Sequence, residues 1–187
     1  MGRTYDEINE RLAAWAQAQP VFFVATAPLD GQAHINCSPK GNRDELRVLD
    51  GRRVAYVDQT GSGIETVAHL QENGRIVVMF CAFDGPPRIV RLHGRGRAVL
   101  AGAGGSEFAR LAEGWPAASG VGVRSIIVVD VERIADSCGY GVPLMSFDQH
   151  RPTLDEWARR KGKSGIEDYW AQKNAASIDD LEGLPKH

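Results

Sequence analysis

A glycine-rich loop holds the residues of this chain whose types and spacing best suit a phosphate group. Thr60-Gly61-Ser62-Gly63 precedes an expected helix, and Thr66 lies in the first turn of that helix. Unpaired backbone N–H groups at a helix start, with the hydroxyls of Thr60, Ser62 and Thr66, can bind an anion at the positive end of the helix dipole. The loop therefore predicts an anion site. The competing interpretation is a capping box, in which Ser62 caps the helix and Glu65 stands three residues on.

Basic side chains elsewhere in the chain favour the anion interpretation. Ser38-Pro39-Lys40-Gly41 ends an expected strand, and Arg88 and Arg91 follow a turn at Pro86-Pro87. Taken singly, each of these cations is more typical of a solvated surface. Local sequence therefore leaves both interpretations of the loop open.

Other chemical motifs are incomplete. Gly162-Lys163-Ser164 resembles the end of a phosphate-binding P-loop, but Trp157 stands where the first glycine belongs. Gly94-Arg95-Gly96 lies inside a strand pattern, so it predicts a bend or bulge and not a dinucleotide fingerprint. The five histidines form no HExxH motif, so we expect no metal site. His34 and His93 are expected to be ordinary hydrogen-bonded histidines, and we name no catalytic side chain.

Composition is that of an ordinary globular protein. The 187 residues are 43% hydrophobic and 25% charged, which excludes a disordered chain. A net charge of −2 argues against nucleic-acid or anionic-membrane binding, and no apolar run reaches the roughly 20 residues that span a bilayer. The three cysteines form no CxxC motif. We therefore expect free thiols in a cytoplasmic protein.

The first expected hairpin has an alternating return strand. A buried strand over 21–26 is followed by a turn at Asp30-Gly31 and a return strand over 33–38. One face of the return strand is apolar and includes Ile35 and Cys37; the other face, with His34, Asn36 and Ser38, is polar. We expect Cys37 on the apolar face to behave as a small buried hydrophobe.

The remaining elements predict a mostly β protein. Thr4 and Glu7 suggest a capping box that starts an N-terminal helix, which ends at Pro20. Further strands are expected over 53–58, 75–83, 88–100 and 124–134, and helices over 64–72 and 106–113. Strands joined mostly by turns favour an antiparallel barrel over a doubly wound parallel sheet.

After Asp136, capping boxes at Thr153 and Ser164 predict two short helices. We therefore divide the chain into a barrel domain over 1–136 and a helical extension over 137–187 that packs on the barrel or on a dimer partner.

In their order and spacing these segments resemble the FMN-binding split-barrel superfamily, specifically proteins similar to pyridoxamine 5′-phosphate oxidase. The resemblance covers about two thirds of the chain, from Trp15 to Ile134. The segments that carry it are Phe22–Thr26, Pro28-Leu29-Asp30-Gly31, Ser38-Pro39-Lys40-Gly41, Val54–Asp58, Thr60-Gly61-Ser62-Gly63, Glu72-Asn73-Gly74-Arg75, Ile76–Phe80 and Arg91–Gly96. It implies a six-stranded antiparallel split barrel with flanking helices, which works as a homodimer with FMN in a cleft between the subunits.

The resemblance also implies which residues hold the cofactor. By position the flavin phosphate would be bound by Ser38, Lys40, Thr60, Ser62, Gly63 and Thr66, with Arg91 beside the flavin ring or the phosphate. The oxidase itself has Ser-Arg-Lys at this helix start, whereas the present chain reads Ser62-Gly63-Ile64-Glu65. Two cationic ligands are therefore absent, and a carboxylate stands close by.

The function implied is that of an FMN-dependent oxidoreductase acting on an unidentified small molecule. A deazaflavin could replace FMN, since the superfamily uses both. Two alternatives from other classes stay open: a flavin-binding protein without turnover, and a haem-binding or haem-degrading protein with a histidine ligand.

Overall fold

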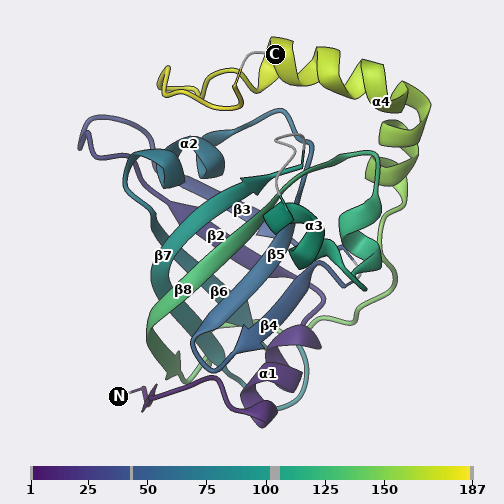
Figure 1. Cartoon of the computed structure of the whole chain (residues 1–187). Coiled ribbons are helices and arrows are strands. Elements are labelled where there is room, and N and C mark those ends of the chain that lie inside the picture. The colour runs from purple at the N-terminus through teal and green to yellow at the C-terminus, as the bar shows by residue number, and fades with distance from the viewer. Residues whose placement is uncertain (1, 43, 102–105, 186–187) are drawn as a thin grey trace.

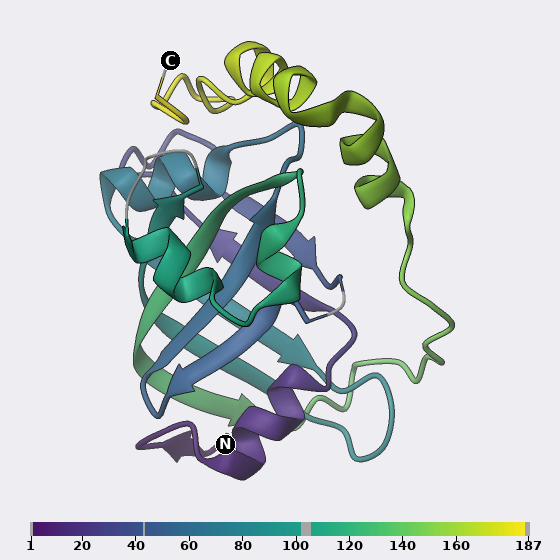
Figure 2. The same ribbon diagram turned by 45° about the vertical axis from the view of Figure 1, so that its right-hand side comes forward.

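One antiparallel sheet forms the frame of the computed structural model, which describes residues 2–42, 44–101 and 106–185. Its spatial order is β3-β2-β6-β7-β8-β5-β4, and β1 pairs with the end of β8. The strands are β1 (Thr4–Tyr5), β2 (Phe22–Thr26), β3 (Asn36–Lys40), β4 (Leu46–Asp50), β5 (Arg53–Gln59), β6 (Arg75–Cys81), β7 (Ile89–Leu100) and β8 (Val123–Ser137). The sheet curls into an open barrel (Figures 1 and 2). The expected mostly β split-barrel class is confirmed, with eight strands in place of six because the short β1 and β4 extend the sheet.

Apolar side chains from alternate strand positions fill the barrel. Phe22 of β2 pairs with Phe80 of β6, and Val24 pairs with Val78, so all four side chains leave the same face of the sheet. All four are buried. Tyr56 of β5 closes the core from the other side, with its ring centroid 5.6 Å from that of Phe22.

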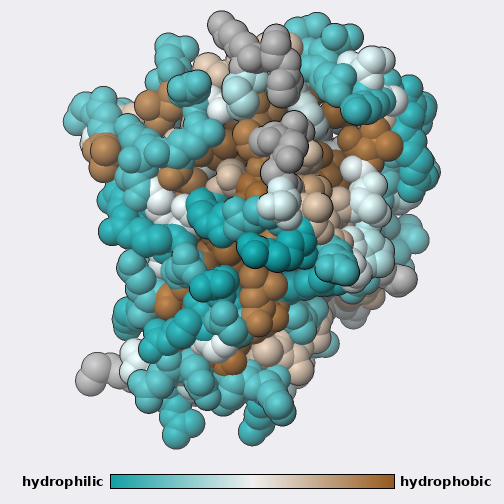
Figure 3. Space-filling model, in the orientation of Figure 1, coloured by the Kyte–Doolittle hydropathy of each residue, from teal (hydrophilic) through white to brown (hydrophobic). Residues whose placement is uncertain are grey.

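Helices cover the two ends and one outer face of the barrel. Figure 1 shows α1 at one end and α2 at the other, while α3 lies over the outer face and α4 crosses the α2 end. The helices are α1 (Glu10–Gln17), α2 (Glu65–Glu72), α3 (Ser106–Ala112), the 3-10 helix η1 (Pro116–Ser119) and α4 (Thr153–Lys173). Among the described residues no helix is both long and apolar enough to cross a membrane. Apolar side chains show on the surface between α3 and α4, within a mostly polar face (Figure 3).

The start of the first helix differs from expectation. Thr4 pairs with β8 as part of β1, so the capping box predicted at Thr4 and Glu7 is wrong. The helix begins at Glu10, and its cap is Asn9, whose side chain accepts a hydrogen bond from the Leu12 N–H at 2.9 Å. Pairing with a long neighbouring strand outweighs the local capping signal here.

The orientation of β3 is the reverse of that expected. Lys40 pairs with Phe22 and Ser38 pairs with Val24, so the polar face of the strand, including Asn36, points toward the barrel interior. Ile35 and Cys37 are exposed instead. The prediction of a buried Cys37 is therefore wrong, because the interior offers partners to Asn36, which bonds to Thr66, and to Lys40, which pairs with Asp58.

The C-terminal region starts with an extended segment, residues 138–152, which we call the strap. The two helices expected after it are joined into α4, which is kinked at Gly162, where φ is 66° and ψ is 178°. Neither predicted capping box starts a helix, since the N-cap position is taken by Pro152 without a side-chain bond. The chain then folds back over α2, where Asn174 is buried.

The bulge predicted by the glycine pair in β7 is confirmed. The register between β7 and β8 shifts between His93 and Gly94. A side chain at Gly94 would collide with the backbone of Asp130 and Val131, so glycine allows the two strands to approach closely.

We expect Gly94→Ala to lower the free energy of unfolding by about 1–3 kcal/mol, the usual cost of overpacking against a rigid backbone. Gly31→Ala is the matched control, because nothing lies within 4 Å of a side chain added there. Urea unfolding of both variants tests this. Equal stabilities of the two variants would contradict the close approach at the bulge.

Candidate functional site

A buried carboxylate lies at the open edge of the barrel, where β3 faces β5. Asp58, at the end of β5, is fully buried. Its oxygens accept hydrogen bonds from Arg124 Nε at 2.8 Å and Nη2 at 3.2 Å, and from Ser125 Oγ at 3.2 Å. Lys40 Nζ, reaching in from β3, lies 3.4 Å from Oδ1. Two cations from two different strands therefore meet one carboxylate.

These cations decide the ionisation of Asp58. Burial alone would raise the pKa of the Asp58 carboxyl, but the charges and hydrogen bonds of Arg124 and Lys40 outweigh burial and lower the pKa from 3.8 to about 2. The carboxylate is therefore ionised at neutral pH. In turn it holds the positive charge of Arg124, which is 4% exposed, inside the protein.

Arg124 also anchors the glycine-rich loop. Its Nη1 donates to the carbonyl oxygen of Gly63 at 2.8 Å and to Asn174 Oδ1 at 2.9 Å. Asn174 Nδ2 then donates to the carbonyl oxygen of Gly61 at 3.0 Å. Because a trans peptide places its C=O and the following N–H on opposite sides, these bonds turn the N–H groups of Ser62 and Ile64 away from Arg124 and Asn174. Among the described residues, the N–H groups from 61 to 64 have no recorded hydrogen-bond partner.

The competing capping-box interpretation of this loop is wrong. Helix α2 begins at Glu65, and its N-cap residue is Ile64, which makes no side-chain cap. Ser62 is exposed and lies ahead of the cap position. The loop is instead held by side chains that come from β8 and α4, so its outward hydroxyl and N–H groups are not used as a cap.

The two predicted threonines face inward. Thr60 Oγ1 donates to the carbonyl oxygen of Gly122 at 2.7 Å and accepts from Trp170 Nε1 at 2.8 Å. Thr66 Oγ1 accepts from Asn36 Nδ2 at 3.0 Å, inside the barrel. The hydroxyls of both threonines are therefore engaged with the protein itself.

The other predicted residues divide between two places. Ser38 shares the inward face of β3 with Lys40, and its hydroxyl is buried with no hydrogen-bond partner among the described residues. Arg91 pairs with Met79 of β6 and leaves the outer face of the sheet, where its Nη1 donates to Ser137 Oγ at 3.1 Å. The structure thus joins Lys40 to the loop through Asp58 and Arg124, and it does not bring Arg91 to them.

The predicted histidines take no part in this network. His34 Nδ1 lies 2.7 Å from Asp179 Oδ1 on the surface. Burial, together with the charges of Arg133 and Arg91, lowers the pKa of His93.

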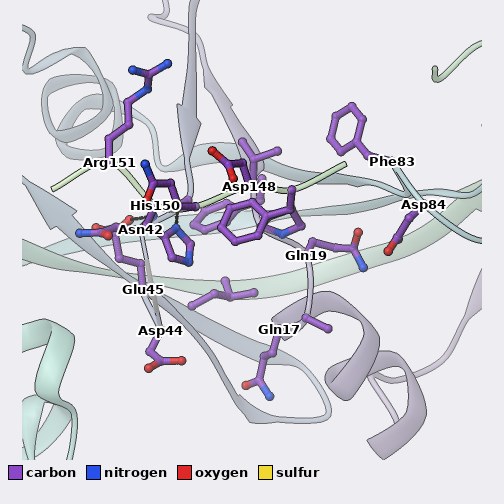
Figure 4. Close-up of a pocket in the computed structure, with 18 of the residues that line it drawn as sticks. Gln17, Gln19, Asn42, Asp44, Glu45, Phe83, Asp84, Asp148, His150 and Arg151 are labelled. Carbon is purple, nitrogen blue, oxygen red and sulfur yellow. Dashed lines mark hydrogen bonds between the residues drawn. The ribbon is translucent and has the colours of Figure 1, made fainter. Parts of the chain in front are cut away.

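A cavity of about 1110 Å³ lies between the strap and the barrel, which is large enough for a small organic molecule. Figure 4 shows His150 of the strap beside Asn42 and Glu45, with Phe83 and Asp84 at the far end. His150 Nδ1 lies 3.1 Å from the carbonyl oxygen of Gly41. Burial raises the pKa of Glu45, an effect opposed by the Asn42 N–H and by the charge of Lys40. The cavity therefore adjoins the Lys40 end of the network.

Sequence reasoning missed three residues of this network: Asp58, Arg124 and Asn174. One signal was available, because Asp58 follows the apolar run 54–57 and Arg124 precedes the apolar run 126–129. Opposite charges next to two buried strands indicate an ion pair between them. Nothing in the local sequence marks Asn174 or the cavity behind the strap, since both depend on how the C-terminal segment folds back.

Comparison with known proteins identifies the family of this chain. The profile of the family described as pyridoxamine 5′-phosphate oxidase matches residues 8–138. The chain belongs to this family. The pyridoxamine 5′-phosphate oxidase family protein ustO of Aspergillus flavus is 40% identical over 194 residues, an alignment that spans 96% of this chain and 77% of that protein.

Solved structures agree on the fold. Two crystal structures of HupZ from Group A Streptococcus, one of a histidine-to-alanine variant, align with TM-scores of 0.53 and 0.51. Both are 21% identical, and they cover 70% and 68% of this chain and 99% and 91% of the HupZ chains. At this identity the likeness concerns the fold alone.

The lowered pKa of Asp58 predicts a pH dependence of stability. A carboxyl with a depressed pKa in the folded state contributes stability above its unfolded pKa, and that stability is lost as pH falls toward the folded pKa. We expect the Asp58 contribution, about 2 kcal/mol, to disappear between about pH 4 and pH 2. Urea unfolding of wild type and Asp58→Asn from pH 5 to pH 2 tests this. The free energy of unfolding of wild type is expected to fall more steeply with falling pH than that of the variant. Parallel curves would contradict the assignment.

Proposed function

We propose that this protein binds a flavin, FMN in the first instance, and works as an FMN-dependent oxidoreductase on an unidentified small molecule. The observation that carries the proposal is the loop at the start of α2. Its carbonyl oxygens are anchored by Arg124 and Asn174, and its N–H groups from 61 to 64 have no hydrogen-bond partner in the described part of the chain. Such an arrangement of N–H groups suits an anion, and membership of the family supports a flavin phosphate as that anion.

The residues present fit this group in defined roles. Ser62, Gly63 and the following N–H group would contact the phosphate. Lys40, whose side chain is 18% exposed, would supply a positive charge, because Arg124 is closer to the loop but buried. The buried, unpartnered hydroxyl of Ser38 is available on the same face of β3. We assign Thr60 and Thr66 the part of positioning the loop, because their hydroxyls bond within the protein.

The chain's own contribution to the reaction is binding and orientation. A bound flavin supplies hydride transfer by its own reactivity, and the protein orients it and excludes competing reactions. The cavity behind the strap, next to Lys40 through Glu45, is the proposed substrate site. Phe83 and Phe147 offer it apolar walls. We also propose that the protein is located in the cytoplasm, which is supported by its three free cysteines.

A homodimer is part of the proposal, with the cofactor between subunits. It is supported by large apolar side chains left exposed just before β3 and along the strap. Ile35 is 76% exposed, Leu144 79% and Tyr140 83%. A second copy of the chain that covers β3 would bury part of this apolar surface.

We expect apo-protein to bind FMN, as measured by quenching of flavin fluorescence. Lys40→Ala is expected to weaken FMN binding about 10- to 150-fold, because a charge-assisted hydrogen bond is lost. Riboflavin, which lacks the phosphate, is expected to bind weakly to wild type, and its affinity is expected to change little in Lys40→Ala. Lys161→Ala on exposed α4 is the charge control. Equal FMN affinity of wild type and Lys40→Ala would overturn the assignment of Lys40.

The same preparation separates the alternatives. If a deazaflavin binds more tightly than FMN, the cofactor is a deazaflavin and not FMN. A Soret band in the purified protein would favour the haem-binding alternative. Bound FMN that neither NADH nor NADPH reduces would favour a flavin-binding protein without turnover.

We expect sedimentation to give twice the 20.4 kDa mass of one chain at micromolar concentration. Ile35→Lys, immediately before β3, is expected to shift the equilibrium toward monomer by placing a charge in the interface. Val121→Lys, at another exposed apolar position, is the control. A wild-type monomer that still binds flavin would exclude the shared cleft.

A further inference from the structure

The carboxylate of Glu65 folds back over the loop. A side chain added at Gly63 would collide with Oε2 of Glu65, so this oxygen occupies the space above the Gly63 backbone. Gly63 has no positive φ, so an ordinary residue could take its backbone conformation, but the flexible Glu65 carboxylate would have to move aside for its side chain. The chain therefore places its own negative charge at the start of α2, where the helix dipole favours it.

Positive charges near the loop are engaged with other groups. Arg124 is buried and bonds to Asp58, to Asn174 and to a loop carbonyl. Lys40 faces the same Asp58 carboxylate. His69 lies in the next turn of α2, and burial lowers its pKa although the charge of Glu65 acts in the opposite direction. Within the part of the chain that the structure describes, none of these three side chains forms a hydrogen bond or ion pair with Glu65.

We propose that Glu65 is a specificity-determining residue, which opposes binding of a phosphate group at the loop while stabilising the empty loop. The inference rests on the proposed flavin function. The Glu65 carboxylate lies above Gly63, in the space that a phosphate bound to the N–H groups of residues 61–64 would approach. Glu65 must therefore move aside or repel the phosphate across a short distance. Either way FMN binds less tightly than the loop geometry alone would allow, and a flavin without phosphate is unaffected.

The test compares Glu65→Gln with wild type in titrations of apo-protein with FMN and with riboflavin. We expect the variant to bind FMN about 5- to 20-fold more tightly, the size expected for removal of one nearby like charge at a partly exposed site. Riboflavin affinity is expected to stay the same. Glu10→Gln is the matched control, because Glu10 is the first-turn acid of another eight-residue helix and the change in net charge is identical.

Thermal unfolding of the apo-protein gives a second readout that needs neither flavin nor activity. Inorganic phosphate is expected to raise the melting temperature of Glu65→Gln more than that of wild type or Glu10→Gln. Without phosphate, Glu65→Gln is expected to melt slightly lower than wild type, because a favourable charge at the helix start is lost.

The outcomes distinguish the two proposals. If FMN binds equally to wild type and Glu65→Gln, or if the affinity for riboflavin rises as much as that for FMN, the role of Glu65 is overturned and the flavin function stands. If no flavin binds to any variant but phosphate stabilises Glu65→Gln selectively, the flavin function is overturned and the role of Glu65 stands. If phosphate affects all variants equally and no flavin binds, both are overturned.

Discussion

The buried carboxylate of Asp58 is the constraint on which the rest of the site depends. A carboxylate taken out of water without a partner is destabilising by several kcal/mol (about 3–5), so Arg124 and Lys40 must stay beside it. Arg124 comes from β8 and Lys40 from the edge strand β3. One charge therefore holds the two sides of the open barrel edge in register and fixes where the guanidinium of Arg124 can reach.

The loop before α2 takes its conformation from that guanidinium. Arg124 and Asn174 bind the carbonyl oxygens of the loop, and planar peptides then direct the following N–H groups away from these two side chains. Two of the side chains that hold the loop, Trp170 and Asn174, lie beyond residue 138, where the family match ends. The C-terminal segment is thus part of the site and not an appendage, and the relative from Aspergillus flavus aligns across it.

At the start of α2, the charge that stabilises the helix disfavours the binding of a phosphate. A glutamate in the first turn stabilises an empty helix start through the helix dipole, and the same charge disfavours an incoming phosphate. The oxidase pattern of two cations at this helix start is replaced here by Gly63 and Ile64, with the Glu65 carboxylate in the space above Gly63. In the proposed site the anion is therefore bound by backbone N–H groups and by Lys40, an arrangement that differs from one built on paired cations.

The sequence by itself determined the β-rich split barrel, the loop ahead of α2 and the bulge at Gly94, because turn residues and strand patterns act over a few residues. Only the tertiary structure decided which face of β3 lies inside. An alternating strand has two faces, and its pattern does not say which of them meets a polar interior. The ion pair of Asp58 with Arg124, the clamp from Asn174 and the cavity under the strap join residues far apart in the chain. Their partners are chosen by burial of charge and by chain folding, which no local spacing records.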